Sequence, residues 1–235
     1  MTPTALAQLA KQRNLFIDLI RASHRGELAT IDALLAQGAD PKEESSRPLR
    51  QAAGAGHAEC VRKLLPHSDI PESNALVWAS AAGHIECVRI LIPEGKPSGK
   101  GCQALVAAAK NGHVECVKLL IPASFPAQDS SHALRMAARN GHVECARLLL
   151  PVSQPLFEHP ELIHGALIDG QAQAAALMFE YEPRLWQRLD LAEALRTCSA
   201  TGHGEMAALL TSIIEKKELS AMAVGQRASA PSARL

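Results

Sequence analysis

Apolar residues recur at steps of three and four positions in two short segments that flank a glycine. In the stretch ALRMAARNGHVECARLLLP, residues 133–151, the apolar positions are Leu134, Ala137 and Ala138 before the glycine and Cys145, Leu148 and Leu149 after it. Such spacing places the apolar side chains on one face of an α-helix. The stretch therefore predicts two short amphipathic helices.

Residues with specific backbone preferences mark the ends of these helices. Gly141 ends the first helix, because glycine readily adopts the left-handed conformation that follows a helix C-terminus. His142 and Glu144 begin the second helix, where the carboxylate faces the positive end of the helix dipole. Pro151 ends it, since proline has no N–H group and crowds the preceding turn. Two antiparallel helices of this length cannot bury their apolar faces alone, so they must stack against neighbours.

The chain repeats this helix–glycine–helix unit. The phrase GHxEC begins at Gly56, Gly83, Gly112 and Gly141, at intervals of 27, 29 and 29 residues. A nearly constant period of this size is typical of a solenoid built from one supersecondary unit. The pattern predicts an all-α array of stacked helix-turn-helix repeats.

The repeated pattern A-L-x-x-A-A-x-x-G-H-x-E-C-V-x-L-L, read as ALVAAAKNGHVECVKLL over residues 104–120, resembles the ankyrin repeat. A first copy over residues 16–41 keeps the family's G-A-D ending, a degenerate copy spans 162–180, and a last copy spans 194–210. The repeat glycines are Gly26, Gly56, Gly83, Gly112, Gly141, Gly170 and Gly202, which indicates about seven repeats. The resemblance implies an ankyrin-like solenoid that binds other proteins.

The copies depart from the family pattern in two ways. The family's T-P-L-H at the start of the first helix is replaced by NALV from residue 74, QALV from residue 103 and HALR from residue 132. The period is also about four residues shorter than the usual 33. Because the missing residues fall in the connection between repeats, we expect shortened hairpin loops.

Composition at the two ends suggests domain boundaries. Residues 1–13 are expected to form an N-terminal cap segment, and residues 14–220 the ankyrin-repeat solenoid, with the sixth repeat degenerate. Residues 221–235 are small, polar and proline-containing, which is typical of a disordered tail.

The chain carries no net charge that would select its partner. It has 24 Lys and Arg against 24 Asp and Glu, with 47% apolar and 3% aromatic residues. No overall field therefore draws it to nucleic acid or to an anionic membrane. The first residues lack the apolar core of a secretory signal, and no segment is long and apolar enough to span a bilayer. We expect a cytoplasmic monomer.

Four cysteines occupy the same position of successive repeats: Cys60, Cys87, Cys116 and Cys145. Free cysteine is among the most buried residue types, and here it fills the inner face of each second helix. Equivalent residues of neighbouring repeats lie about 10 Å apart, the spacing of packed helices. A disulfide needs Cα atoms within about 7 Å. The cysteines are therefore predicted to be structural free thiols.

A histidine follows the glycine in most repeats: His57, His84, His113, His142 and His203. A metal site needs several ligands within about 2–2.3 Å of one ion, whereas a solenoid separates equivalent residues by a full repeat. These histidines are interpreted as helix-start residues. Neither a metal nor a cofactor is expected.

Catalytic motifs are missing from the sequence. It contains no P-loop, GxGxxG, HExxH or GxSxG pattern. Cysteine and histidine are plentiful, but a reactive thiolate needs an accessible electropositive site, and the repeated cysteines have a packing role. A non-enzymatic protein is the favoured interpretation. A hydrolase or transferase with a site in the irregular region 162–190 is the alternative.

The resemblance places the binding surface on the concave face, which the first helices and connecting loops form. The residues expected there are Arg50, Lys110, Asn111, Arg135, Arg139 and Asn140. Together they suggest a mildly basic groove complementary to an acidic segment of a partner. The alternative is that these side chains only keep the surface soluble.

A second candidate surface is aromatic. Phe179, Tyr181 and Trp186 gather in MFEYEPRLWQRLD, between the sixth and seventh repeats. Exposed Tyr and Trp are typical anchors of interfaces, but they also cover irregular junctions between repeats. The sequence as a whole predicts a protein–protein interaction module or scaffold. A bacterial effector that engages a host protein in the host cytosol is a variant of this hypothesis.

Overall fold

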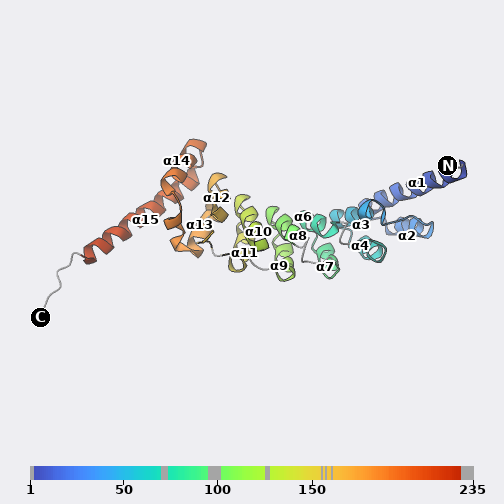
Figure 1. Cartoon of the computed structure of the whole chain (residues 1–235), viewed down its shortest axis with the longest axis horizontal. Coiled ribbons are helices and arrows are strands. Elements are labelled where there is room, and N and C mark those ends of the chain that lie inside the picture. The colour runs from blue at the N-terminus through green and yellow to red at the C-terminus, as the bar shows by residue number, and fades with distance from the viewer. Residues whose placement is uncertain are drawn as a thin grey trace. The chain divides into compact units, whose positions relative to one another are not determined.

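The computed structural model describes residues 3–69, 74–94, 102–124, 128–154, 156, 158–159 and 161–228. Helices account for nearly all regular structure in these residues, and no β-strand occurs among them (Figure 1). The chain divides into two compact units. Unit 1 comprises residues 1–137 and 144–154, and unit 2 comprises residues 138–143 and 155–235.

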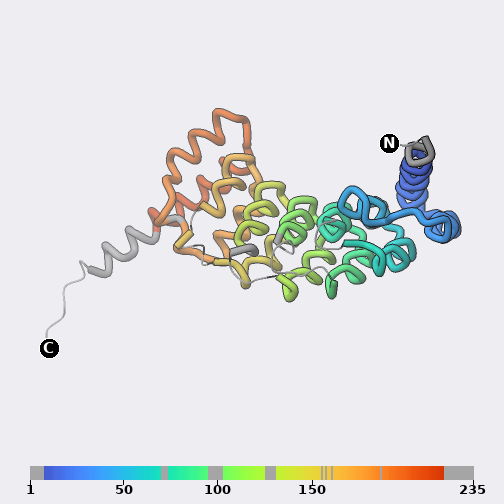
Figure 2. The backbone as a smooth tube through the Cα atoms, turned by 45° about the vertical axis from the view of Figure 1, so that its right-hand side comes forward, coloured from blue at the N-terminus to red at the C-terminus, as the bar shows by residue number. Residues whose placement is uncertain are grey.

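Unit 1 consists of two layers of helices. The first helices of the repeats are α1 (Pro3–Arg25), α3 (Glu43–Ala55), α6 (Ala75–Ala82), α8 (Cys102–Lys110) and α10 (Gln128–Arg139, of which residues up to 137 belong to unit 1). The second helices are α2 (Leu28–Ala36), α4 (Ala58–Leu64), α7 (Ile85–Leu91), α9 (Val114–Leu120) and α11 (Val143–Leu149). Helix α3 packs between α1 and α6, and α4 packs between α2 and α7 (Figure 2). The predicted stack of helix-turn-helix repeats is confirmed.

The repeated A-L-x-x-A-A pattern explains how the first helices pack. In α6, Ala75, Leu76, Ala79 and Ser80 are buried, and the equivalent residues of α8 and α10 are buried as well. Small alanines allow neighbouring helices to approach closely, while one leucine per copy fills the space between the layers. The cysteines of the second helices are at most 2% exposed. The core is therefore aliphatic, as the low aromatic content predicts.

All seven repeat glycines adopt a left-handed backbone conformation, with φ between 69° and 84°. The prediction that these glycines end the first helices is confirmed. The prolines, in contrast, do not end the second α-helices directly. In three copies the α-helix stops at Leu64, Leu120 or Leu149, and the proline lies in a following turn of 3-10 helix, η1 (Leu65–His67), η3 (Ile121–Ala123) or η4 (Leu150–Val152).

A serine two residues after each of these prolines closes the helix end. The hydroxyls of Ser68, Ser124 and Ser153 donate to the carbonyl oxygens of Leu64, Leu120 and Leu149, at 2.8, 2.8 and 2.7 Å. The last carbonyls of a helix have no partner within the helix, so a side-chain donor stabilises its end. The recurring P-x-S sequence therefore serves as the C-terminal cap of the repeat.

Unit 2 contains the degenerate sixth repeat and the last repeat. Its helices are α12 (Glu161–Ile168), α13 (Ala172–Tyr181), α14 (Leu191–Thr201) and α15 (Gly204–Ala228), with the 3-10 helix η5 (Pro183–Arg188) between the two repeats. Gly170 has a φ of 69° and connects α12 to α13, so the degenerate copy keeps the helix–glycine–helix geometry. Helix α14 packs against both α12 and α15.

The terminal helices are longer than those of the inner repeats. Helix α1 begins at Pro3, so the predicted cap segment is continuous with the first helix of the first repeat. Helix α15 runs to Ala228, so the backbone is helical over 221–228, where the composition predicts a disordered tail. This segment follows IIEKKELS, residues 213–220, which is rich in strong helix formers, and extending an existing helix costs little. Residues 229–235 lie outside the described residues. None of the described helices is long and apolar enough to cross a membrane.

Candidate interaction surface

The first helices of unit 1 expose four positions per repeat. These are the two residues between the buried pairs, such as Val77 and Trp78, and the two residues before the repeat glycine, such as Ala81 and Ala82. Every such residue of unit 1 is exposed or half-buried, while the four positions between them are buried in α3, α6, α8 and α10. We call this surface the first-helix face.

Trp78 is the largest apolar side chain on the first-helix face, and 49% of it is exposed. Its ring lies against Gly54 of α3, where an added Cβ would be 3.1 Å from Cε3 of the indole. The guanidinium carbon of Arg50, one turn earlier on α3, lies 5.8 Å from the ring centroid. This is the geometry of a cation–π contact. Trp78 and Arg50 thus form a contact pair that joins two neighbouring repeats.

Trp78 is absent from the residues predicted above. It stands where the neighbouring copies carry Gln51, Ala107 or Met136. An aromatic residue at a position where these copies carry none, on the outward side of a first helix, is the sequence signal that points to it.

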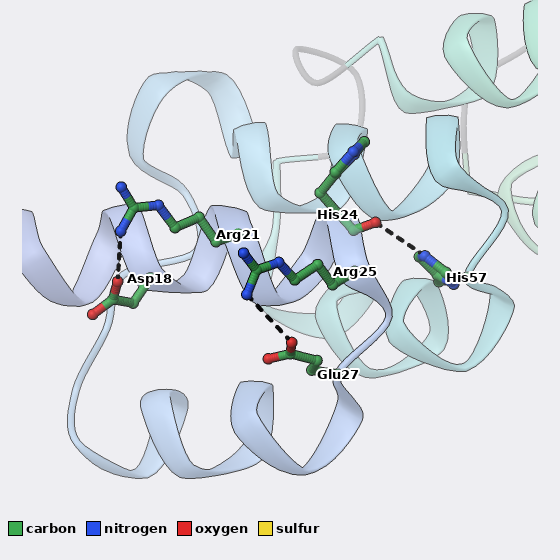
Figure 3. A network of polar contacts seen from close by, with 6 residues as sticks. All are labelled: Asp18, Arg21, His24, Arg25, Glu27 and His57. Atoms are coloured by element: carbon green, nitrogen blue, oxygen red, sulfur yellow. Dashed lines mark hydrogen bonds and ion pairs between the residues drawn. The ribbon is translucent and has the colours of Figure 1, made fainter.

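The charged side chains of the first-helix face are all basic: Arg21, Arg25, Arg50, Lys110 and Arg135. Arg21 pairs with Asp18 at 3.4 Å and Arg25 with Glu27 at 3.7 Å (Figure 3). Arg50 has no carboxylate partner among the described residues, and its buried Nε makes no hydrogen bond. Arg50 therefore carries a charge that no described carboxylate neutralises.

Histidines after the repeat glycines join each repeat to the preceding one. Nε2 of His57, His84 and His113 lies 3.0, 3.1 and 3.0 Å from the carbonyl oxygens of His24, Gly54 and Ala81, respectively (Figure 3 shows the first of these). Each acceptor belongs to the last turn of a first helix, where carbonyls lack partners within the helix. The imidazole therefore carries its proton on Nε2 and donates it to this carbonyl. Among the described residues, no three His, Cys, Asp or Glu side chains gather as metal ligands.

The predicted candidates in unit 1 occupy different environments. Arg50 is half-buried beneath Trp78, whereas Lys110 and Arg135 are exposed on α8 and α10. Asn111 donates from Nδ2 to the carbonyl oxygen of Ala81 at 2.8 Å, the same acceptor that His113 uses. Asn111 thus has a role in joining repeats.

The remaining candidates lie in unit 2. Arg139, the last residue of α10, donates from Nε to Oδ2 of Asp169 at 2.7 Å and lies across Gly165 of α12. Asn140 is exposed. Tyr181, at the end of α13, is 53% exposed, while Phe179 is buried. The side chain of Trp186 lies outside the described residues. The basic candidates are therefore divided between the two units, and Arg139 is neutralised by a neighbour.

The repeated cysteines are free thiols buried in the core, as predicted. Burial raises the pKa of each thiol, and the glutamate one residue earlier raises it further, to about 11 for Cys87 and for Cys145. A thiol with so high a pKa is protonated at neutral pH and is a poor nucleophile.

A cavity of about 570 Å³ lies in unit 2 beside α12 and α14, within the region predicted for an alternative enzymatic site. Its lining includes His164, Arg188, Asp190 and Cys198. Asp190 accepts from the backbone N–H of Glu193 at 3.0 Å and so caps α14. The thiol of Cys198 donates to the carbonyl oxygen of Leu167 at 3.5 Å, and burial raises its pKa. Both groups thus bond to the backbone around them.

Comparisons with known proteins agree with this architecture. The family model "Ankyrin repeats (3 copies)" matches residues 19–98 and 92–159. Among solved structures, the human ASB11 ankyrin repeat domain is similar in fold, with a TM-score of 0.59 and 21% sequence identity over 70% of this chain and 83% of that chain. The comparison with curated proteins gives no match. The family match covers more than half of the residues, and the chain therefore belongs to the ankyrin-repeat family.

Proposed function

We propose that the chain is a non-enzymatic module that binds another protein along the first-helix face of unit 1. Ankyrin repeats are in general protein–protein interaction modules. The observation that carries the proposal is the half-exposed Trp78 seated on Arg50, on a face whose charges are all basic. Aromatic and arginine side chains are the commonest anchors of protein interfaces.

The repeat architecture supports binding by a preformed surface. Each histidine–carbonyl bond fixes one repeat on the next, so the outward side chains are held by nearest-neighbour contacts. A preformed surface reduces the ordering cost of association. The buried free thiols fit a reducing compartment such as the cytoplasm. The module is proposed to act there as a monomer, which size-exclusion chromatography with light scattering checks.

Affinity capture with charge reversal tests the proposal. The full chain and a variant with Lys110→Glu and Arg135→Glu are immobilised in parallel, and captured proteins are identified by mass spectrometry. Both side chains are exposed on the first-helix face, so the melting temperature should not change. We expect the specific partner to be lost from the variant.

A matched control separates the face from the net charge. Arg89→Glu with Arg147→Glu makes the same change in net charge on the second helices, where both arginines are more than half exposed. The control should retain the partner. Equal capture by all three proteins, or equal loss from both variants, contradicts binding through the first-helix face.

A further inference from the structure

We infer that Trp78 and Arg50 form the anchor point for a partner segment in which an acidic side chain adjoins an apolar one. The inference rests on the proposed function, because it assigns the chemistry of the partner at that same face.

The apolar half of the anchor is the exposed part of the indole. Gly54 of α3 lies against the ring, and the other outward residues next to the repeat glycines are small, namely Ala55 on α3 and Ala81 and Ala82 on α6. One side of the ring is covered by Gly54, and the next copy carries only Ala107 at the position of Trp78. The indole therefore stands above its surroundings, and an apolar side chain of a partner can pack beside it on the small residues.

The polar half of the anchor is the guanidinium of Arg50. It is held beside the indole at 5.8 Å, is half-buried, and has no carboxylate partner among the described residues. Three buried side-chain atoms of the described residues lack a hydrogen bond, namely Nε of Arg50, Oδ1 of Asn74 and Oγ of Ser80. All three belong to α3, to α6 or to the residue preceding α6, the two helices that carry Arg50 and Trp78. A partially desolvated cation of this kind gains most from a carboxylate.

Charge complementarity selects an acidic segment. The four positions of the first-helix face hold no Asp or Glu in unit 1. The exposed Asp18 of α1 and Glu44 of α3 lie at other positions and pair with Arg21 and Arg47. Arg21 and Arg25 precede Trp78 in the stack and Lys110 follows it, so the apolar patch has basic neighbours on both sides. Because Arg21 and Arg25 already pair with Asp18 and Glu27, the charge suits a short acidic peptide better than a phosphate backbone, which needs several free cations.

Peptide display on the full chain tests the inference. A phage-displayed library of random linear peptides is selected on the wild-type protein, and the enriched consensus peptide is synthesised and titrated by fluorescence anisotropy. We expect a consensus with Asp or Glu next to an aromatic or aliphatic residue. Trp78→Ala and Arg50→Gln should each weaken the Kd at least tenfold, and Trp78→Phe should weaken it less because a ring is retained.

Arg89→Gln is the matched control, since it removes an exposed cation from the second helix α7, outside the first-helix face, and should change the Kd less than threefold. Circular dichroism melting verifies that each variant is folded. A consensus peptide that binds Trp78→Ala and Arg50→Gln as tightly as wild type, yet is lost with Lys110→Glu and Arg135→Glu, overturns the inference and leaves the proposed function standing. A neutral or basic consensus, or tighter binding of oligothymidine than of the peptide, also overturns it. Failure to enrich any peptide counts against both.

Discussion

The imidazole of His84 donates a hydrogen bond to the carbonyl oxygen of Gly54 across the boundary between two repeats, at 3.1 Å. The same ring covers Gly56, the residue that ends the first helix of the preceding repeat. The Gly-His dipeptide therefore acts in pairs: the glycine of one repeat leaves room for the histidine of the next. Nearest-neighbour coupling in this solenoid is built from this contact as well as from apolar packing.

Gly56→Ala should lower the free energy of unfolding by more than the cost of holding an alanine in the left-handed conformation. Gly56 has a φ of 84°, and an added Cβ would lie 2.6 Å from Nδ1 of His84. The left-handed conformation costs a non-glycine residue about 1–2 kcal/mol, and displacing the ring adds a further ~1–3 kcal/mol. Urea denaturation measures the total loss.

Gly38→Ala is the control for that experiment, because Gly38 has a φ of 85° but no atom within 4 Å of an added Cβ. The free energy of unfolding of this variant should fall only by the cost of the left-handed backbone, about 1–2 kcal/mol. Equal losses for the two variants would show that the histidine ring moves aside at no cost.

His84→Ala should lower the free energy of unfolding by about 1–2 kcal/mol, because the carbonyl of Gly54 loses its donor and the ring loses its packing against Gly56. His84→Gln should lose less. Gln171 fills the histidine position of the sixth repeat, where its amide lies against Gly141 and donates to the carbonyl oxygen of Asp169 at 3.4 Å. A glutamine therefore keeps the packing against the repeat glycine. Urea denaturation of the two variants compares them. A glutamine variant no more stable than the alanine variant would contradict a role for this packing.

The repeat architecture was predictable because it depends on residues that recur. Glycine in the left-handed region and apolar residues at helical spacing impose the same local structure in each copy, so period and pattern suffice. Features that depend on contacts between copies were not predictable. The helix-start role of His57 is correct but incomplete, because its acceptor, the carbonyl of His24, lies in another repeat.

The candidate surface was only partly predictable, for the same reason. Arg139 and Asn111 occupy outward positions by sequence, yet each bonds to a neighbouring repeat. Conversely, Trp78 stands out in the sequence as an aromatic at its repeat position, but its half-exposed setting beside Arg50 is known only from the structure. Residue type indicates which side chains can bind a partner. Contacts with the neighbouring repeat, which only the structure shows, decide which of these side chains are already engaged within the chain.

Disrupting the pair between Arg139 and Asp169 should have little effect on stability. The two side chains are 56% and 33% exposed, and exposed ion pairs contribute about 0.2–1 kcal/mol. A double-mutant cycle with Arg139→Ala and Asp169→Ala should give a coupling energy in this range that shrinks at high salt. A coupling energy above about 2 kcal/mol would instead indicate that this pair is a main support of the sixth repeat.

The repeated thiols should resist modification in the native protein. In a Cys102→Ser background, an aromatic disulfide reagent at pH 8 should label the remaining thiols only as fast as the protein unfolds. With a pKa of about 11, Cys87 and Cys145 are ionised to only ~0.1% at that pH, whereas an ordinary thiol with a pKa of 9.0 is ~10% ionised. Rapid labelling at pH 8 under native conditions would mean that the second helices open locally, and it would contradict the role of these cysteines as closed core residues.

The same pKa values predict how the stability of the protein depends on pH. Because folding raises the pKa of Cys87 and Cys145, the protonated thiols stabilise the native state fully below pH 9, and this contribution is lost as the pH rises toward 11. The stability difference between wild type and Cys87→Ala with Cys145→Ala should therefore be constant below pH 9 and decrease above it.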